Sequence, residues 1–236
     1  MSASNKSSSD RREFLAHVAS AAVILAGTAC AAPLSAASAQ AALGAPSGGK
    51  SPFDDSWTQR VKAAKHRAVF DSPGVEDGLA LVHATFFVQG YHEALDTADG
   101  EVVPVVVMRH QGTPMALGDA LWEKYALGER AKVKDPLTGN FALRNPFIHV
   151  EKDDRKSLIP QAASLEGLKA SGAVLLACNK AAMRIAGEVA QKFGKDAEEV
   201  RNEFRNGLAP GVVLQPSGIY AVLRAQDVGC AFIKST

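Results

Sequence analysis

Short apolar runs without a charged side chain recur along this chain, and they constrain its fold more than any other feature. One of them, Val102–Met108, is rich in β-branched residues, and a second occupies residues 173–177. Strands that lack polar alternation are typical of parallel sheets covered by helices on both faces. Shorter apolar runs occur at 212–214 and 231–233, and at 67–70, where Arg67 precedes three apolar residues. The chain is therefore predicted to contain about five mostly parallel strands.

Helical stretches separate these runs, so the predicted fold class is α/β. Residues 79–90, 180–193 and 218–228 carry apolar side chains at helical spacing. Strands and helices in alternation pack as a three-layer sandwich of the flavodoxin-like kind, with the sheet in the middle. The residues expected on the inward face are Leu79, Val82, His83, Phe86 and Gly90 in the first helix and Ile219, Val222 and Leu223 in the last.

Two places interrupt the alternation. Pro104 has no amide hydrogen to donate, so either the strand begins at Val105 or the part before it lacks a neighbouring strand on that side. Residues 130–160 contain Asp-Pro, Thr-Gly-Asn and Asn-Pro turns and a charged run at 151–156. A non-periodic insert of this length is expected to lie on the surface, as a lid or a subunit contact.

The charge balance and the cysteine count exclude several classes of protein. The 236 residues include 26 Lys and Arg against 25 Asp and Glu, and 47% are hydrophobic. This composition indicates a folded chain, and without a basic excess it gives no support for nucleic-acid binding. Three cysteines are too few for a disulfide-stabilised scaffold, and the near-zero mean hydropathy does not fit a multi-span membrane protein.

The N-terminal region is expected to be an export signal outside the folded domain. Residues 14–49 contain no acidic side chain, lysine or arginine, and 13 of residues 16–42 are alanine. Upstream, residues 11–15 (Arg-Arg-Glu-Phe-Leu) resemble the twin-arginine (Tat) export motif. Residues 39–41 (Ala-Gln-Ala) fit a signal-peptidase site, which predicts a mature periplasmic chain.

Two other interpretations of this region compete with a cleaved signal. A membrane anchor is disfavoured because the segment is rich in small residues and is interrupted by Pro33. A lipid-modified Cys30 is disfavoured because the residues before it lack the leucine of that motif. The expected organisation is a Tat signal at 1–41, a linker or N-terminal extension at 42–64 and an α/β domain at 65–236, with no stable membrane span after cleavage.

The carboxyl ends of the strands are where an open parallel sheet binds ligands, so the residues that follow each run are candidates for a site. No phosphate-binding glycine motif and no set of residues with metal-ligand spacing occurs, so neither a cofactor nor a metal is predicted. The candidates are Arg109 and His110 after the second run, Cys178, Asn179 and Lys180 after the third, and Ser217 after the fourth.

Cys178 is the strongest candidate because it stands where a buried strand meets the next helix. Free amide hydrogens and the positive end of the helix dipole favour a thiolate there, and Lys180 adds a cation. The alternative is a packing role, since cysteine is among the most buried residue types. Cys230 begins the last strand, at the opposite edge of the sheet and beyond disulfide reach, so a core role is favoured for it.

Two of the other candidates also allow alternative roles. His110, next to Arg109, could protonate a leaving group or hold an anion, or it could be an ordinary exposed loop histidine. Ser217 precedes Gly218 and is most simply a helix N-cap, although the same helix start could hold a small anion.

Two segments together resemble the DsrE/DsrF-like (DsrE family, DsrEFH-like) sulfur-relay proteins. Residues 172–183 place a cysteine followed by an asparagine between a strand and a helix, and residues 212–232 are similar to the family's last strand, helix and strand. The resemblance covers residues 65–234 without the insert. It implies a flavodoxin-like sheet without flavin, assembly into homo- or hetero-oligomers, and persulfide transfer through Cys178.

The favoured function is therefore an exported DsrE-like protein that accepts or carries sulfane sulfur as a persulfide on Cys178. Its partner would be a small sulfur species, such as a polysulfide, thiosulfonate or persulfide, or the thiol of a partner protein. The alternative is a non-catalytic periplasmic binding or assembly module of the same fold, in which Cys178 is structural. A thiol redox enzyme ranks last, because Cys230 is badly placed to act as a resolving cysteine.

Overall fold

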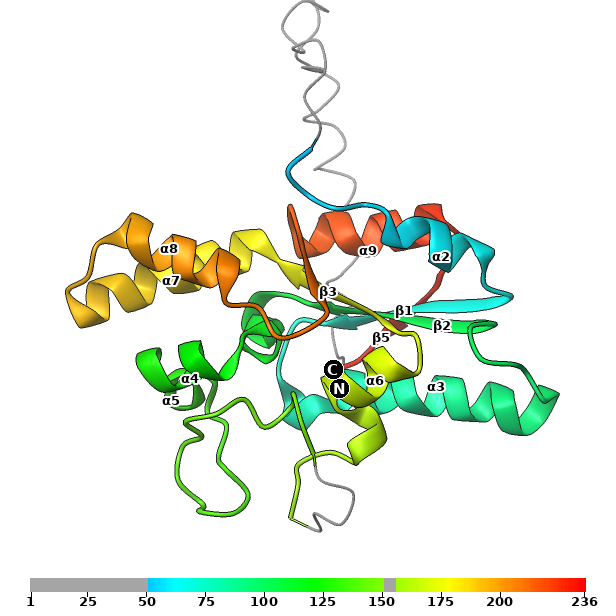
Figure 1. Ribbon diagram of the computed structural model, residues 1–236, viewed down its shortest axis with the longest axis horizontal. Coiled ribbons are helices and arrows are strands. Elements are labelled where there is room, and N and C mark those ends of the chain that lie inside the picture. Colours follow the sequence, from blue (N-terminus) through cyan, green and yellow to red (C-terminus); the bar gives the residue numbers. More distant parts are fainter. Residues whose placement is uncertain (1–50, 151–155) are drawn as a thin grey trace, which may run out of the picture. The chain divides into compact units, whose positions relative to one another are not determined.

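Five parallel strands form the sheet in the computed structural model, which describes residues 51–150 and 156–236 (Figure 1). In chain order they are β1 (His66–Ser72), β2 (Val102–Met108), β3 (Val174–Cys178), β4 (Val212–Gln215) and β5 (Ala231–Lys234). Their order across the sheet is β4-β3-β2-β1-β5, and every neighbouring pair is parallel. The predicted signal at 1–41 and most of the charged run at 151–156 fall outside the described residues.

Helices cover both faces of this sheet (Figure 1). The core on one face contains α2 (Trp57–Ala63) and α9 (Gly218–Asp227). The core on the other face contains α3 (Leu79–Leu95), α4 (Asp119–Tyr125), α5 (Leu127–Ala131), α6 (Leu165–Ala170), α7 (Asn179–Phe193) and α8 (Ala197–Asn206). Short 3-10 helices, η2 (Glu76–Gly78), η3 (His110–Ala116) and η4 (Gln161–Ala163), lie in the connections. The predicted three-layer α/β sandwich is confirmed.

Cover on both faces explains the apolar runs. Every residue of β2 and of β3 is buried, so neither strand has a solvent side that would favour polar alternation. Pro104 pairs with Ala68 of β1, whereas the pairing of β2 with β3 begins at Val105. Pro104 thus lies where β2 has a neighbour on one side, which is the second of the two explanations that the sequence allowed.

The direction of winding reverses after β4. The first four strands follow one another across the sheet, and their connecting helices pack into the core of one face. The chain then crosses the opposite face through α9 and places β5 beside β1. This strand order differs from the 2-1-3-4-5 order of flavodoxin, but it creates the same kind of switch point. Here the helices that follow β3 and β4 leave toward opposite faces.

The predicted inward faces of two helices are wrong in part. In α3, Phe86 is 59% exposed, and the buried side chains include Ala80 and Ala84. In α9, Ile219 and Leu223 are 58% and 56% exposed, whereas Val222 is buried as predicted. Both helices turn alanines toward the core, because a small side chain allows the helix to approach the sheet closely. None of the helices in the described ranges is long and apolar enough to cross a bilayer.

The segment predicted as a linker contains an ordered helix. Trp57 and Val61 of α2 are buried in the same core as α9. Arg224 of α9 donates to Asp55 Oδ2 from Nε and Nη2, at 3.0 and 2.8 Å. The compact unit that contains residues 51–236 therefore includes α2, which lies in the predicted linker or N-terminal extension.

The insert is not wholly a surface segment, contrary to expectation. Asn145 is buried, and its Nδ2 donates to the carbonyl oxygens of Met115 and Leu117, both at 2.8 Å. Phe147 and Ile148 are buried in the core beside it. Leu137, in contrast, is exposed as predicted. Buried backbone polar groups need hydrogen-bond partners, and Asn145 supplies them for a connection without regular structure.

Candidate functional site

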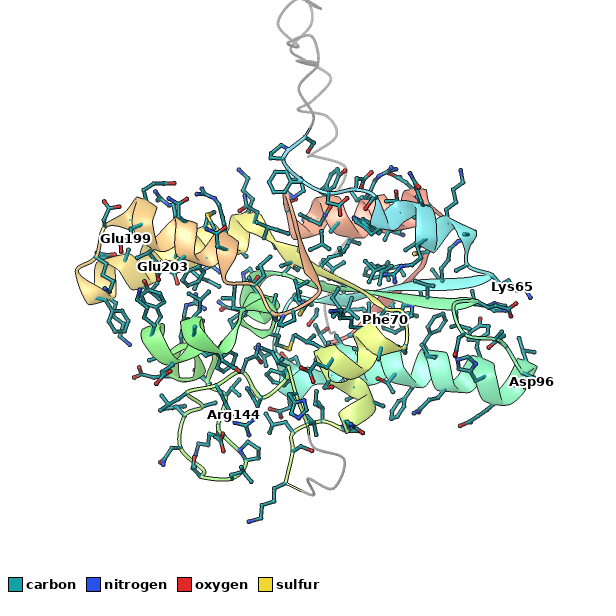
Figure 2. The ribbon with its side chains drawn as sticks, viewed as in Figure 1. Lys65, Phe70, Asp96, Arg144, Glu199 and Glu203 are labelled. Atoms are coloured by element: carbon teal, nitrogen blue, oxygen red, sulfur yellow. The ribbon has the colours of Figure 1, made fainter. Side chains whose placement is uncertain are left out.

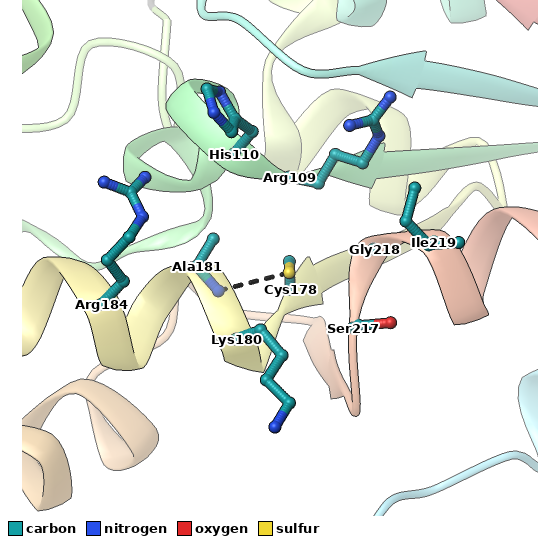
Figure 3. A pocket seen from close by; sticks show the side chains of 9 residues that line it. All are labelled: Arg109, His110, Cys178, Lys180, Ala181, Arg184, Ser217, Gly218 and Ile219. Atoms are coloured by element: carbon teal, nitrogen blue, oxygen red, sulfur yellow. Dashed lines mark hydrogen bonds between the residues drawn. The ribbon is translucent and has the colours of Figure 1, made fainter.

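A cavity of about 310 Å³ lies at the switch point of the sheet (Figure 3). Three strands contribute to it, because β2, β3 and β4 all end at the same edge and their following segments diverge there. The lining residues are Arg109, His110, Cys178, Lys180, Ala181, Arg184, Ser217, Gly218 and Ile219. Five of the six predicted site residues are thus brought together, from segments more than a hundred residues apart.

Cys178 occupies the centre of this arrangement (Figure 3). It is the last residue of β3 and the N-cap of α7, and its Sγ accepts a hydrogen bond from the amide of Ala181 at 3.3 Å. The residue is 6% exposed, yet it lines the cavity. The sulfur thus faces an amide donor and the start of a fifteen-residue helix, which is the position typical of nucleophilic cysteines.

Arg109 is held rigidly across the cavity from Cys178. Its Nε and Nη2 donate to Asp71 Oδ1 and Oδ2 at 2.6 and 2.7 Å, a bidentate pair with a buried carboxylate at the end of β1. The bonds to Asp71 raise the pKa of Arg109, and negative charge on Cys178 raises it further. The side chain also fills the space beside Gly218, where an added Cβ would lie 2.3 Å from Arg109 Cβ. Gly218 is therefore required for this close approach.

His110 follows Arg109 and lies exposed at the rim of the cavity. Its φ of 52° places a non-glycine residue in the left-handed region, which costs on the order of 1 kcal/mol. The next amides, those of Gln111 and Gly112, donate to the carbonyl oxygen of Pro73 and hold this turn against the end of β1. Such a histidine is accessible to a bound ligand and to solvent.

The start of α9 forms another wall of the cavity. Ser217 Oγ accepts a hydrogen bond from the amide of Tyr220 at 3.1 Å, so the predicted N-cap role is confirmed. Ile219, which the sequence placed in the core, instead lines the cavity with an exposed apolar side chain. The wall thus combines a helix start with an apolar surface.

The first turns of α7 contribute residues that differ in accessibility. Lys180 is exposed and lines the cavity. Asn179 does not line it, and its Oδ1 is buried without a hydrogen-bond partner in the described part of the chain. Arg184, one turn after Lys180, lines the cavity although the sequence analysis did not select it. Its spacing of four residues from Lys180 was the available signal, because residues i and i+4 share a helix face.

The cavity is cationic. Three lining residues, Arg109, Lys180 and Arg184, carry positive charge, and no carboxylate is among the lining residues. A metal site is not built here, since no group of three or more His, Cys, Asp or Glu side chains with suitable placement occurs among residues 51–150 and 156–236. What the arrangement offers is a nucleophilic sulfur in a small cavity that favours anions.

Cys230 lies apart from this cavity. It precedes β5 and is buried in the core beneath α9, and both it and Cys178 are free thiols. Burial raises the pKa of Cys230 to about 11. Its environment is that of the packing residue that the sequence predicted.

Comparison with known proteins gave no match to a protein-family model, to a curated protein or to a solved structure.

Proposed function

We propose that this protein carries sulfane sulfur as a persulfide on Cys178, in the manner of the DsrE-like proteins that its sequence resembles. One observation carries the proposal. The Cys178 thiol lies at the switch point of the sheet, as the N-cap of a long helix, in a cavity lined by three cations and no carboxylate. Electropositive, partly accessible settings of this kind distinguish reactive cysteines from inert ones.

The proposed reaction needs no cofactor. The Cys178 thiolate attacks the outer sulfur of a polysulfide, thiosulfonate or persulfide, the donor's sulfur–sulfur bond breaks, and the shortened donor leaves with the electron pair. Lys180 stabilises the anions on both sides of this step, while His110 at the rim can protonate the leaving group. The terminal sulfur then passes to the thiol of a partner protein that docks at the same edge.

We further propose that the protein acts in the periplasm after Tat export, as a homo-oligomer. The basis is the Arg-Arg-Glu-Phe-Leu motif at residues 11–15 and the resemblance to the DsrE-like family. Tat substrates cross the membrane folded, which suits a domain whose buried strands pair over long sequence distances.

A second candidate function is a binding or assembly module of the same fold in which Cys178 is structural. It is favoured by one observation: Cys178 is 6% exposed, and its sulfur is already engaged as a helix cap. In this case the cavity would bind a ligand without forming a covalent bond to sulfur.

Intact mass spectrometry after exposure to inorganic polysulfide separates the two candidates. The expected result is a reducible adduct of one or more sulfur atoms on the folded wild type, retained in Cys230→Ser and absent from Cys178→Ser. If Cys178 is labelled only after denaturation, the cysteine is structural and the module is the better interpretation.

A further inference from the structure

We propose that the sulfur donor for Cys178 is a thiosulfate-type anion, in which the transferred outer sulfur is bonded to a sulfonyl group. This inference rests on the proposed persulfide function and specifies its substrate class. It is carried by the charge that remains at the cavity after the ion pairs around it are accounted for, and by the lining of that cavity, which Lys180 and Arg184 share with Cys178.

The charge of Arg109 is already compensated. Its guanidinium faces the buried carboxylate of Asp71, with both carboxylate oxygens engaged. Arg109 therefore shapes the wall and contributes little net charge to a ligand.

The charge of α7 is compensated only in part. Lys180 has no ion-pair partner in the part of the chain that the structure describes. Arg184 shares the carboxylate of Glu188 with Arg130, at 2.6 and 2.5 Å. Hydrogen bonding to Arg130 lowers the pKa of Glu188, so Glu188 is ionised. Its single negative charge faces the two positive charges of Arg130 and Arg184. Two positive charges thus remain in this region, one on Lys180 and one shared between Arg184 and Arg130 of α5.

The positions of these charges suit a donor with an anionic head and a sulfur tail. Lys180 and Arg184 both line the cavity from α7, four residues apart, and Cys178 caps the same helix at its start; the two charged side chains extend to opposite sides of the helix (Figure 3). Sulfonyl oxygens can accept hydrogen bonds from either of these exposed side chains, which leaves the outer sulfur free to meet Sγ. A cavity of about 310 Å³ is at the lower end of the range for ligand sites, which fits an anion of this size.

The reaction balances without an external oxidant or reductant. The thiol proton is first released to solvent. The thiolate Sγ then forms a bond to the outer sulfur of thiosulfate, the sulfur–sulfur bond of thiosulfate breaks, and its electron pair leaves with sulfite. The products are Cys178 persulfide and one sulfite, with the same total charge as the reactants.

The test measures sulfite release and the Cys178 adduct in the purified protein, with thiosulfate and inorganic polysulfide as separate donors. In Lys180→Gln/Arg184→Gln, the rate with thiosulfate is expected to fall at least about tenfold, because the charge-assisted contacts that either side chain can make to the sulfonyl group are lost. The rate with polysulfide, which is also an anion but has no sulfonyl oxygens to bind, is expected to fall by a clearly smaller factor. Both side chains are exposed, so the variant retains the core of the wild type.

Arg205→Gln is the matched control. It removes a positive charge from the exposed surface of α8, where Arg205 pairs with Glu198 at 3.0 Å and does not line the cavity. Its rates should equal those of the wild type with both donors.

The outcomes separate this inference from the function on which it rests. Sulfite released in equal amount to the adduct, with selective loss in the double variant, supports the inference. Polysulfide labelling of Cys178 without a reaction with thiosulfate, or an equal loss with both donors, overturns the inference and leaves persulfide carriage intact. Failure of both donors on the folded wild type overturns the proposed function itself.

Discussion

The two free cysteines of the domain are buried to the same extent but lie in opposite chemical environments. Cys178 is 6% exposed and Cys230 is 7% exposed. The first ends a strand, caps a helix and faces a cationic cavity. The second precedes a strand and lies in an apolar core, where burial raises its pKa to about 11. The reactivity of each thiol depends on the end of the strand at which it lies and not on its burial. Helix N-termini converge at the carboxyl ends of the strands, where Cys178 lies.

The largest expected effect is in the alkylation of the native protein by iodoacetamide. At pH 7 a thiol with a pKa of about 11 is ionised in roughly one molecule in ten thousand, about 300-fold less than an ordinary cysteine. Cys178 should therefore react at least about 100-fold faster than Cys230, as measured by peptide mapping over time. The thiolate fraction of Cys230 grows about tenfold per pH unit below its pKa, so its own alkylation rate should rise by that factor as the pH rises. Equal rates at pH 7 would remove the distinction between the two thiols.

Gly218→Ala tests the wall that faces Cys178. The new Cβ would lie 2.3 Å from Arg109 Cβ, so either Arg109 or the start of α9 must move. We expect a loss of about 1–3 kcal/mol in the free energy of unfolding, together with slower persulfide formation. Urea denaturation measures the first effect, and mass spectrometry measures the second.

Gly187→Ala is the control for that substitution. Gly187 lies within α7, and no heavy atom lies within 4 Å of a Cβ added there. Alanine should stabilise the protein by about 0.5–1 kcal/mol, because glycine is a poor helix former. If both variants were equally stable, the contact between Arg109 and Gly218 would not be structurally important.

Serine substitutions compare the two thiols as structural elements. Cys230→Ser buries a hydroxyl in an apolar core and should lower the free energy of unfolding by about 1–2 kcal/mol. Cys178→Ser keeps a cap for the Ala181 amide, and serine is a preferred N-cap, so the change should stay within about 0.5 kcal/mol. Parallel urea titrations would contradict this if Cys178→Ser were the more destabilised variant.

The smallest expected effect concerns the other helix start at the cavity. Ser217→Ala removes the acceptor for the Tyr220 amide and should cost about 0.5–1 kcal/mol in the free energy of unfolding. Because Ser217 acts as a cap, persulfide formation on Cys178 should continue at the wild-type rate. A strong loss of that rate with unchanged stability would instead assign Ser217 to ligand binding.

Local features of this protein could be predicted from its sequence. The apolar runs predicted all five strands, and the position of Cys178 at a strand end predicted its place at the start of α7. The N-cap role of Ser217 was also predictable. These features depend on residues close in the chain, so periodicity and capping preferences report them directly.

Features that join distant segments could not be predicted in this way. Both stripes of α3 are apolar, so periodicity could not show that its alanines face the core and that Phe86 lies outside. The buried role of Asn145 likewise depends on carbonyl groups of a segment about thirty residues earlier. In each case the choice is made by packing partners that local sequence does not identify.

The sequence by itself determined the fold class and the residue that could act as a nucleophile, since both follow from short-range patterns. The tertiary structure decided where that residue would act. The strand order β4-β3-β2-β1-β5 creates the switch point between β3 and β4, brings Asp71 to Arg109, and turns Arg184 into the same cavity as Cys178. Strand order is set by the long-range pairing and packing of the whole chain, so the site exists only when the sheet has formed.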